Sequence, residues 1–206
     1  MNNAEIHTKS TTEIKCEITN KVTIKPKKMN KTSEQFENEI EKCRKVFAMK
    51  AKDYGTSWRI LRLPSLTDQI FIKANRIRSI QMSGVNEIEE GIVPEFIAMV
   101  NYSVIALIQI ELGLDGEQDL PFDTTMELYN KHINATKDLM IRKNHDYGEA
   151  WRQMRVSSMV DIILMKIKRI KQIEDNNGKT LISEGVEGSY TDIINYSIFS
   201  LIQLGE

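Results

Sequence analysis

Apolar residues recur every three or four positions through long stretches of the chain. Phe36, Ile40, Cys43 and Phe47 show this spacing in the first stretch, and it is typical of an amphipathic helix that buries one face. Two later stretches are apolar on nearly every side, which predicts helices in the middle of a bundle. Strict apolar-polar alternation is weak, so we predict an all-α fold. The six expected helices cover about residues 33–53, 65–80, 94–112, 123–146, 158–173 and 190–204.

The chain contains one pattern twice. Residues 50–80 and 143–173 align without a gap, and 14 of the 31 aligned positions are identical. The shared strings are Asp-Tyr-Gly-x-x-Trp-Arg, Ser-x-x-Asp, Lys-x-x-Arg-Ile and, one position out of register, Asn-Tyr-Ser. Two copies of one unit predict a helical bundle with pseudo-two-fold symmetry. We divide the chain into a non-helical N-terminal tail, mobile or forming a short hairpin (1–30), a first repeat (31–113), a linker (114–121) and a second repeat (122–206).

Composition excludes several classes of function. With 28 basic and 29 acidic residues the net charge is −1, so we expect no direct nucleic-acid binding, which needs a basic face. Two cysteines and three histidines fit no zinc spacing and no disulfide framework. No apolar run approaches the roughly 18 residues of a membrane span, and no signal peptide opens the chain. We therefore expect a cytoplasmic protein without membrane contact.

Pairs of cations and single acids occupy the second helix of each repeat. Within each cation pair the two residues are three apart and share one face of the helix, which suits a phosphate chain. A solvated face with apolar stems is the alternative. Asp68 and Asp161 each follow a serine by three residues, the spacing of a capping box at a helix start, and metal binding is the competing interpretation. The predicted phosphate-binding residues are Lys73, Arg76, Lys166 and Arg169.

An asparagine interrupts each of the two most apolar helices. An unpaired buried amide costs about 1–3 kcal/mol, so Asn101 and Asn195 each need a partner: the pseudo-symmetric asparagine, a tyrosine hydroxyl or a ligand. Asp192 lies three residues before Asn195, on nearly the same face, whereas the first repeat has Ala98 there. The carboxylates thus differ between the repeats more than the cations do.

The Asp-Tyr-Gly-x-x-Trp-Arg string is the most distinctive element of the chain. Its glycine suits the end of a helix, and its aromatics could stack a base beside an arginine. The alternative is a helix stop that two aromatic rings pin to the core. As base- or sugar-binding candidates we take the aromatic and amide residues of the two repeats: Tyr54, Trp58, Asn101, Tyr102, Tyr147, Trp151, Asn195 and Tyr196.

These motifs together resemble the nucleotide modification associated domain 1 family, in two tandem copies over about residues 34–206. That family is in turn similar to MazG-like all-α nucleoside triphosphate pyrophosphohydrolases. The resemblance implies a MazG-like bundle and Mg²⁺-dependent hydrolysis or modification of a (deoxy)nucleoside phosphate. Asp161, Glu184 and Asp192 would then be the catalytic and metal-binding residues. The alternative function is a non-catalytic nucleotide-binding or partner-docking module. A homodimer is the other partnership that the sequence leaves open.

Overall fold

The computed structural model describes residues 31–85, 91–113, 119–180 and 185–205, and within these ranges the chain is helical without any strand. This confirms the all-α prediction, whereas the predicted tail lies outside the described residues. Each repeat contributes one long helix, a short 3₁₀ turn and two further helices. The elements are α1 (Lys31–Tyr54), η1 (Ser57–Ile60), α2 (Leu63–Ser83), α3 (Val93–Leu112), α4 (Phe122–Tyr147), η2 (Ala150–Gln153), α5 (Val156–Asp175) and α6 (Val186–Gly205).

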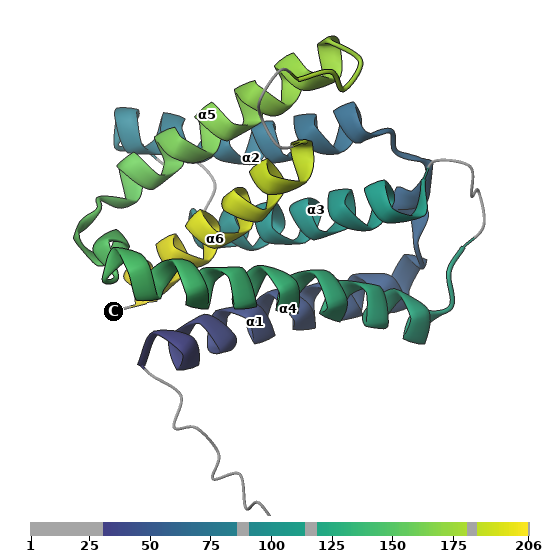
Figure 1. The fold of residues 1–206 in the computed structure, drawn as a ribbon, viewed down its shortest axis with the longest axis horizontal. Coiled ribbons are helices and arrows are strands. Elements are labelled where there is room, and N and C mark those ends of the chain that lie inside the picture. Colours follow the sequence, from purple (N-terminus) through teal and green to yellow (C-terminus); the bar gives the residue numbers. More distant parts are fainter. Residues whose placement is uncertain (1–30, 86–90, 114–118, 181–184, 206) are drawn as a thin grey trace, which may run out of the picture.

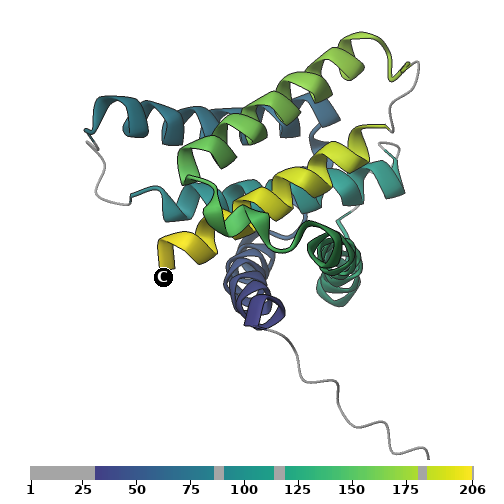
Figure 2. The same ribbon diagram turned by 60° about the vertical axis from the view of Figure 1, so that its left-hand side comes forward.

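The helices form three layers, and each layer pairs the equivalent helices of the two repeats (Figures 1 and 2). α2 packs beside α5 in one outer layer, α3 beside α6 in the middle layer, and α1 beside α4 in the other outer layer. The middle pair contacts both outer layers. This arrangement is the pseudo-two-fold bundle that the internal repeat predicts.

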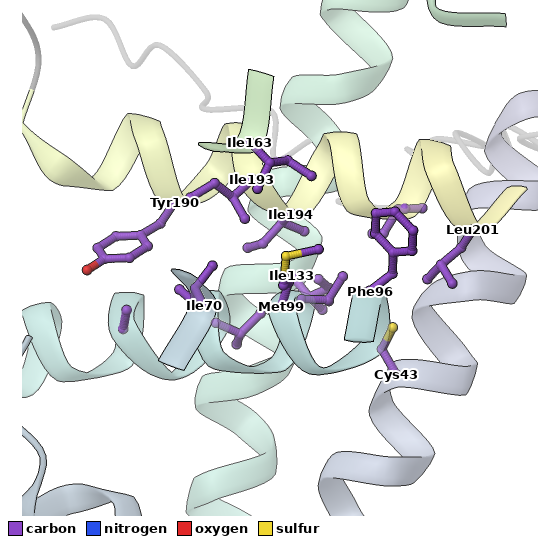
Figure 3. Packing of buried hydrophobic residues seen from close by; sticks show 14 of the residues in the cluster. Cys43, Ile70, Phe96, Met99, Ile133, Ile163, Tyr190, Ile193, Ile194 and Leu201 are labelled. Atoms are coloured by element: carbon purple, nitrogen blue, oxygen red, sulfur yellow. The ribbon is translucent and has the colours of Figure 1, made fainter. Parts of the chain in front are cut away.

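The middle layer explains why its two helices are apolar on nearly every side. Phe96 and Met99 of α3 lie between that helix and α6, where they meet Ile194 and Leu201 (Figure 3). By length and mean hydropathy α3 could cross a membrane, so our statement that no run approaches a span is wrong by this measure. However, 67% of that segment is buried inside the protein. A central helix of a bundle has the same composition as a membrane span because both are covered on all sides.

The helix ends correct one prediction and confirm another. Gly55 and Gly148 adopt left-handed φ angles of 62° and 58° directly after α1 and α4, as a C-terminal cap requires. The capping-box interpretation is wrong, because α2 and α5 begin at Leu63 and Val156, two residues before the serines. Neither N-cap residue makes a side-chain capping bond.

A glutamine from the middle layer fixes the turn after the glycine in both repeats. The Gln109 amide nitrogen donates to the carbonyl oxygens of Arg59 (3.2 Å) and Leu61 (2.9 Å). Gln203 donates in the same way to Trp151 and Met154, both at 3.0 Å. Leu-Ile-Gln occurs in both repeats and ends at Gln109 and Gln203. This glutamine therefore holds the Trp-Arg turn against the core, where the turn forms one wall of a cavity.

Candidate functional site

Each repeat contains a cavity between its outer long helix and its middle-layer helix. The first-repeat cavity, between α1, η1 and α3, has a volume of about 590 Å³. The second-repeat cavity, between α4, η2 and α6, has a volume of about 270 Å³. All eight predicted base- or sugar-binding residues line one or the other. The pairs that occupy equivalent walls are Lys50 and Lys143, Tyr54 and Tyr147, Trp58 and Trp151, Asn101 and Asn195, and Tyr102 and Tyr196.

The two asparagines have different environments. In the first repeat, the Tyr129 hydroxyl donates to Asn101 Oδ1 (2.9 Å), and Asn101 Nδ2 donates to the Cys43 carbonyl (3.1 Å). A tyrosine hydroxyl is therefore the partner of Asn101, one of the three predicted possibilities. Asn195 is only 5% exposed, and its Oδ1 has no hydrogen-bond partner among the residues that the structure describes. The position equivalent to Tyr129 is Phe36, which has no hydroxyl to donate.

A second amide in the second-repeat cavity is also incompletely paired. The Trp151 indole N–H donates to Asn144 Oδ1 at 3.1 Å. An indole nitrogen can only donate, so this bond fixes the orientation of the Asn144 amide. Its buried Nδ2 then has no acceptor in the described part of the chain. One unpaired donor and one unpaired acceptor, from Asn144 and Asn195, thus line the same cavity.

Charge is concentrated at Asp192 in the second-repeat cavity. Lys143 Nζ lies 3.0 Å from Asp192 Oδ1, and Lys166 Nζ lies 2.7 Å from Oδ2. Burial acts to raise the pKa of Asp192, but hydrogen bonds from Lys166 and Lys143 outweigh burial and place the pKa below its ordinary value. The carboxylate therefore joins all three layers of the second repeat: α4, α5 and α6.

The equivalent ion pairs of the first repeat use another acid. Glu95, which is 6% exposed, lies 2.5 Å from Arg76 and 3.3 Å from Lys73. Serine 189 occupies the position equivalent to Glu95, and Arg169 has no carboxylate within ion-pair distance among the described residues. The four predicted phosphate-binding residues are thus placed differently in the two repeats. Phosphate binding itself stays a prediction.

The described residues do not fit the predicted Mg²⁺ site. Both oxygens of Asp192 are engaged by ammonium groups. Asp161 is 63% exposed and lies 3.8 Å from Arg78. Glu184 lies outside the described residues, and within those residues no three His, Cys, Asp or Glu side chains gather closely enough to hold a metal ion. We therefore derive no chemical step through a metal.

Three features of the site were not found from the sequence. Asn144 lies two residues before the distinctive string and aligns with Ala51, so comparison of the repeats gave no signal. The role of Tyr129 depends on a contact between repeats, which alignment of one repeat on the other does not reveal. Gln109 and Gln203 did carry a signal, because both copies retain them, but their partners are backbone carbonyls.

The fold and the cavities define a tandem-duplicated, all-α protein with a cavity at the equivalent place in each repeat. A family model described as nucleotide modification associated domain 1 matches residues 50–110 and 143–204. The chain belongs to this family and contains two copies of its domain. Neither the curated proteins nor the solved structures include a match to the chain. The similarity to MazG-like enzymes therefore stays a prediction.

Proposed function

We propose that the chain is a nucleotide-binding protein and that the second-repeat cavity receives the nucleotide. The observation that carries the proposal is the buried Oδ1 of Asn195, which has no partner among the described residues and lines this cavity. The name of the family supports a nucleotide as the ligand.

The cost of the unpaired acceptor supports a role in binding. An unsatisfied buried polar group costs about 1–3 kcal/mol, a large part of the roughly 5–15 kcal/mol by which proteins are stable. The first repeat satisfies the same asparagine with the hydroxyl of Tyr129. The second repeat has Phe36 at that position and leaves the acceptor free. A ligand that donates to Asn195 would recover the lost hydrogen bond.

The polar groups of the cavity match the edge of a nucleobase. The Watson–Crick edge of each base carries a hydrogen-bond acceptor next to a donor, and the cavity offers a donor from Asn144 and an acceptor from Asn195. Trp151 already stacks on Phe199, with ring centroids 4.4 Å apart, and the Arg152 guanidinium lies 4.3 Å from its centroid. We therefore assign base stacking to Tyr147, which is 73% exposed at the same cavity.

Phosphate groups would bind at the cations around Asp192. Lys143 and Lys166 share this single carboxylate, so the cluster carries a net positive charge. A phosphate can accept hydrogen bonds from both ammonium groups, and Arg169 follows Lys166 by three residues on the same helix face. Because Asp192 is engaged by the lysines, we propose binding without a metal requirement rather than Mg²⁺-dependent hydrolysis.

A thermal-shift screen against nucleosides and nucleoside mono-, di- and triphosphates, with Mg²⁺ and with EDTA, tests the proposal. A ligand that binds the folded state raises the melting temperature by mass action. We expect a shift that persists in EDTA. Release of phosphate or pyrophosphate that stops in EDTA would instead support the hydrolase.

A matched pair of variants then locates the site. Asn195→Leu removes an unpaired acceptor, so it should keep or raise the stability of the free protein while abolishing the nucleotide-induced shift. Asn101→Leu removes a paired amide and leaves the buried Tyr129 hydroxyl without its acceptor, so it should lower stability while the shift persists. Loss of binding in Asn101→Leu alone would refute the assignment to the second repeat.

A further inference from the structure

The first-repeat cavity differs from its counterpart in size and chemistry. It is about 590 Å³ in volume, within the usual range for small-molecule sites, and more than twice as large as the second-repeat cavity. Two of the polar wall residues of the second repeat are replaced by alanine: Ala51 stands for Asn144 and Ala98 for Asp192. The wall is instead largely apolar, with Val46, Phe47 and Ile105 among its members.

The substitution by Ala98 leaves Lys50 without a counter-charge. In the second repeat the equivalent Lys143 lies 3.0 Å from Asp192. No Asp or Glu lines the first-repeat cavity, and within the described ranges no carboxylate lies at ion-pair distance from Lys50. Lys50 is exposed at the edge of this cavity, so solvent hydrates its charge in the free protein and a ligand carboxylate could take the place of that solvent.

The remaining polar groups of this cavity favour an acceptor on the ligand. Both polar atoms of Asn101 already have a partner, in the Tyr129 hydroxyl and the Cys43 carbonyl. The Trp58 indole N–H has lost the acceptor that Asn144 gives Trp151, because Ala51 has no side-chain oxygen. No hydrogen bond from the Trp58 indole is found within the described residues, and its nitrogen is not one of the fully buried polar atoms that lack a partner. Lys50 and Trp58 are thus two donors at the wall of one cavity.

We infer that the first-repeat cavity binds an apolar monoanion, meaning a molecule with a hydrocarbon body and a single carboxylate head. The body fills the apolar wall, and the carboxylate accepts from Lys50 and Trp58. Such a ligand needs few polar partners along its body, and beyond Lys50, Trp58 and Asn101 the polar side chains of the wall are the hydroxyls of Tyr54, Ser57 and Tyr102. This site is independent of the nucleotide site proposed for the second repeat.

Decanoate, with decan-1-ol as its neutral counterpart, tests the inference in the full-length chain. The chain has two tryptophans, so in Trp151→Phe the emission comes from Trp58 alone and reports occupancy of the first-repeat cavity. We expect saturable binding of one decanoate per chain, about tenfold tighter than decan-1-ol, since a charge-assisted hydrogen bond contributes about 1.5–3 kcal/mol. In Trp58→Phe the fluorescence of the remaining Trp151 should not change when decanoate is added.

Two substitutions separate charge from apolar contact. Lys50→Met should abolish the preference for decanoate while decan-1-ol still binds. Ala98→Asp supplies the acid of the second repeat and should weaken decanoate by at least about tenfold, because like charges repel and Lys50 gains an internal partner. Far-ultraviolet circular dichroism establishes that each variant is folded.

Four results would overturn the inference: equal affinity for decanoate and decan-1-ol, an unchanged preference in Lys50→Met, a response from Trp151 rather than Trp58, or a flat response to both probes. Nucleotide binding is followed by the fluorescence of Trp151 in the absence of decanoate. A failure of the nucleotide proposal is therefore distinguishable from a failure of the decanoate proposal.

Discussion

Removal of the Tyr129 hydroxyl deletes the hydrogen bond to Asn101 Oδ1 and so gives this oxygen the environment of Asn195 Oδ1. Tyr129 is 0% exposed, and its hydroxyl lies 2.9 Å from Asn101 Oδ1. Its ring stacks on Phe47, with centroids 4.4 Å apart, and Tyr129→Phe keeps this contact. The substitution therefore leaves Asn101 Oδ1 buried and unpaired, as Asn195 Oδ1 is now. We expect a loss of about 1–3 kcal/mol in the free energy of unfolding.

Urea denaturation followed by circular dichroism measures this loss, provided that the slope of the transition is unchanged. Tyr147→Phe is the control, because Tyr147 is 73% exposed and surface substitutions usually change stability by less than about 0.5 kcal/mol. Asn101→Leu completes a double-mutant cycle in which the two losses should be strongly non-additive. Equal stability of Tyr129→Phe and Tyr147→Phe would refute the reasoning.

Three further outcomes follow from the structure. Gly148→Ala should destabilise the protein by about 1–2 kcal/mol in thermal melts, since φ is +58° and no atom lies within 4 Å of an added Cβ; Gly205→Ala, with equal space and no positive φ, should not. Burial raises the pKa of Glu174 above its ordinary value of 4.5, with the Thr67 hydroxyl only partly opposing it, so the folded state holds this proton more tightly. Stability should therefore fall as pH rises above about 4.5 through the folded pKa, and Glu174→Gln should flatten that decline in urea titrations. Phe36→Tyr should weaken nucleotide binding in calorimetric titrations, because the hydroxyl would occupy the acceptor of Asn195.

Much of the fold could be predicted because the repeat and the apolar spacing agree. The boundaries of the six helices lie within a few residues of the expected ones, and the glycines after α1 and α4 end their helices as expected. The three-layer arrangement follows from helices α3 and α6 being apolar all round, which requires cover on both sides. The capping boxes were wrong because both helices begin two residues before the serine, α2 with Pro64 in its first turn and α5 without a proline.

From the sequence we could predict residues that line the cavities and the difference between Asp192 and Ala98, but not the different environments of the two asparagines. The repeated aromatic and amide residues do line the two cavities. However, whether the oxygen of Asn101 or Asn195 has a hydrogen-bond donor depends on Tyr129 and Phe36. The hydrogen bond from Tyr129 to Asn101 joins one repeat to the other. Sequence spacing within a repeat carries no information about such a contact. The sequence likewise did not predict which carboxylate forms an ion pair with each lysine.

The central claim is that the second repeat binds a nucleotide through Asn195 without a metal. Its most direct test is calorimetric titration, in EDTA, of the nucleotide that gives the largest thermal shift into wild type and into Asn195→Leu. We predict saturable binding of one nucleotide per wild-type chain and no measurable heat with the folded variant. Equal affinity in the two proteins, or binding that appears only when Mg²⁺ is added, would contradict the claim.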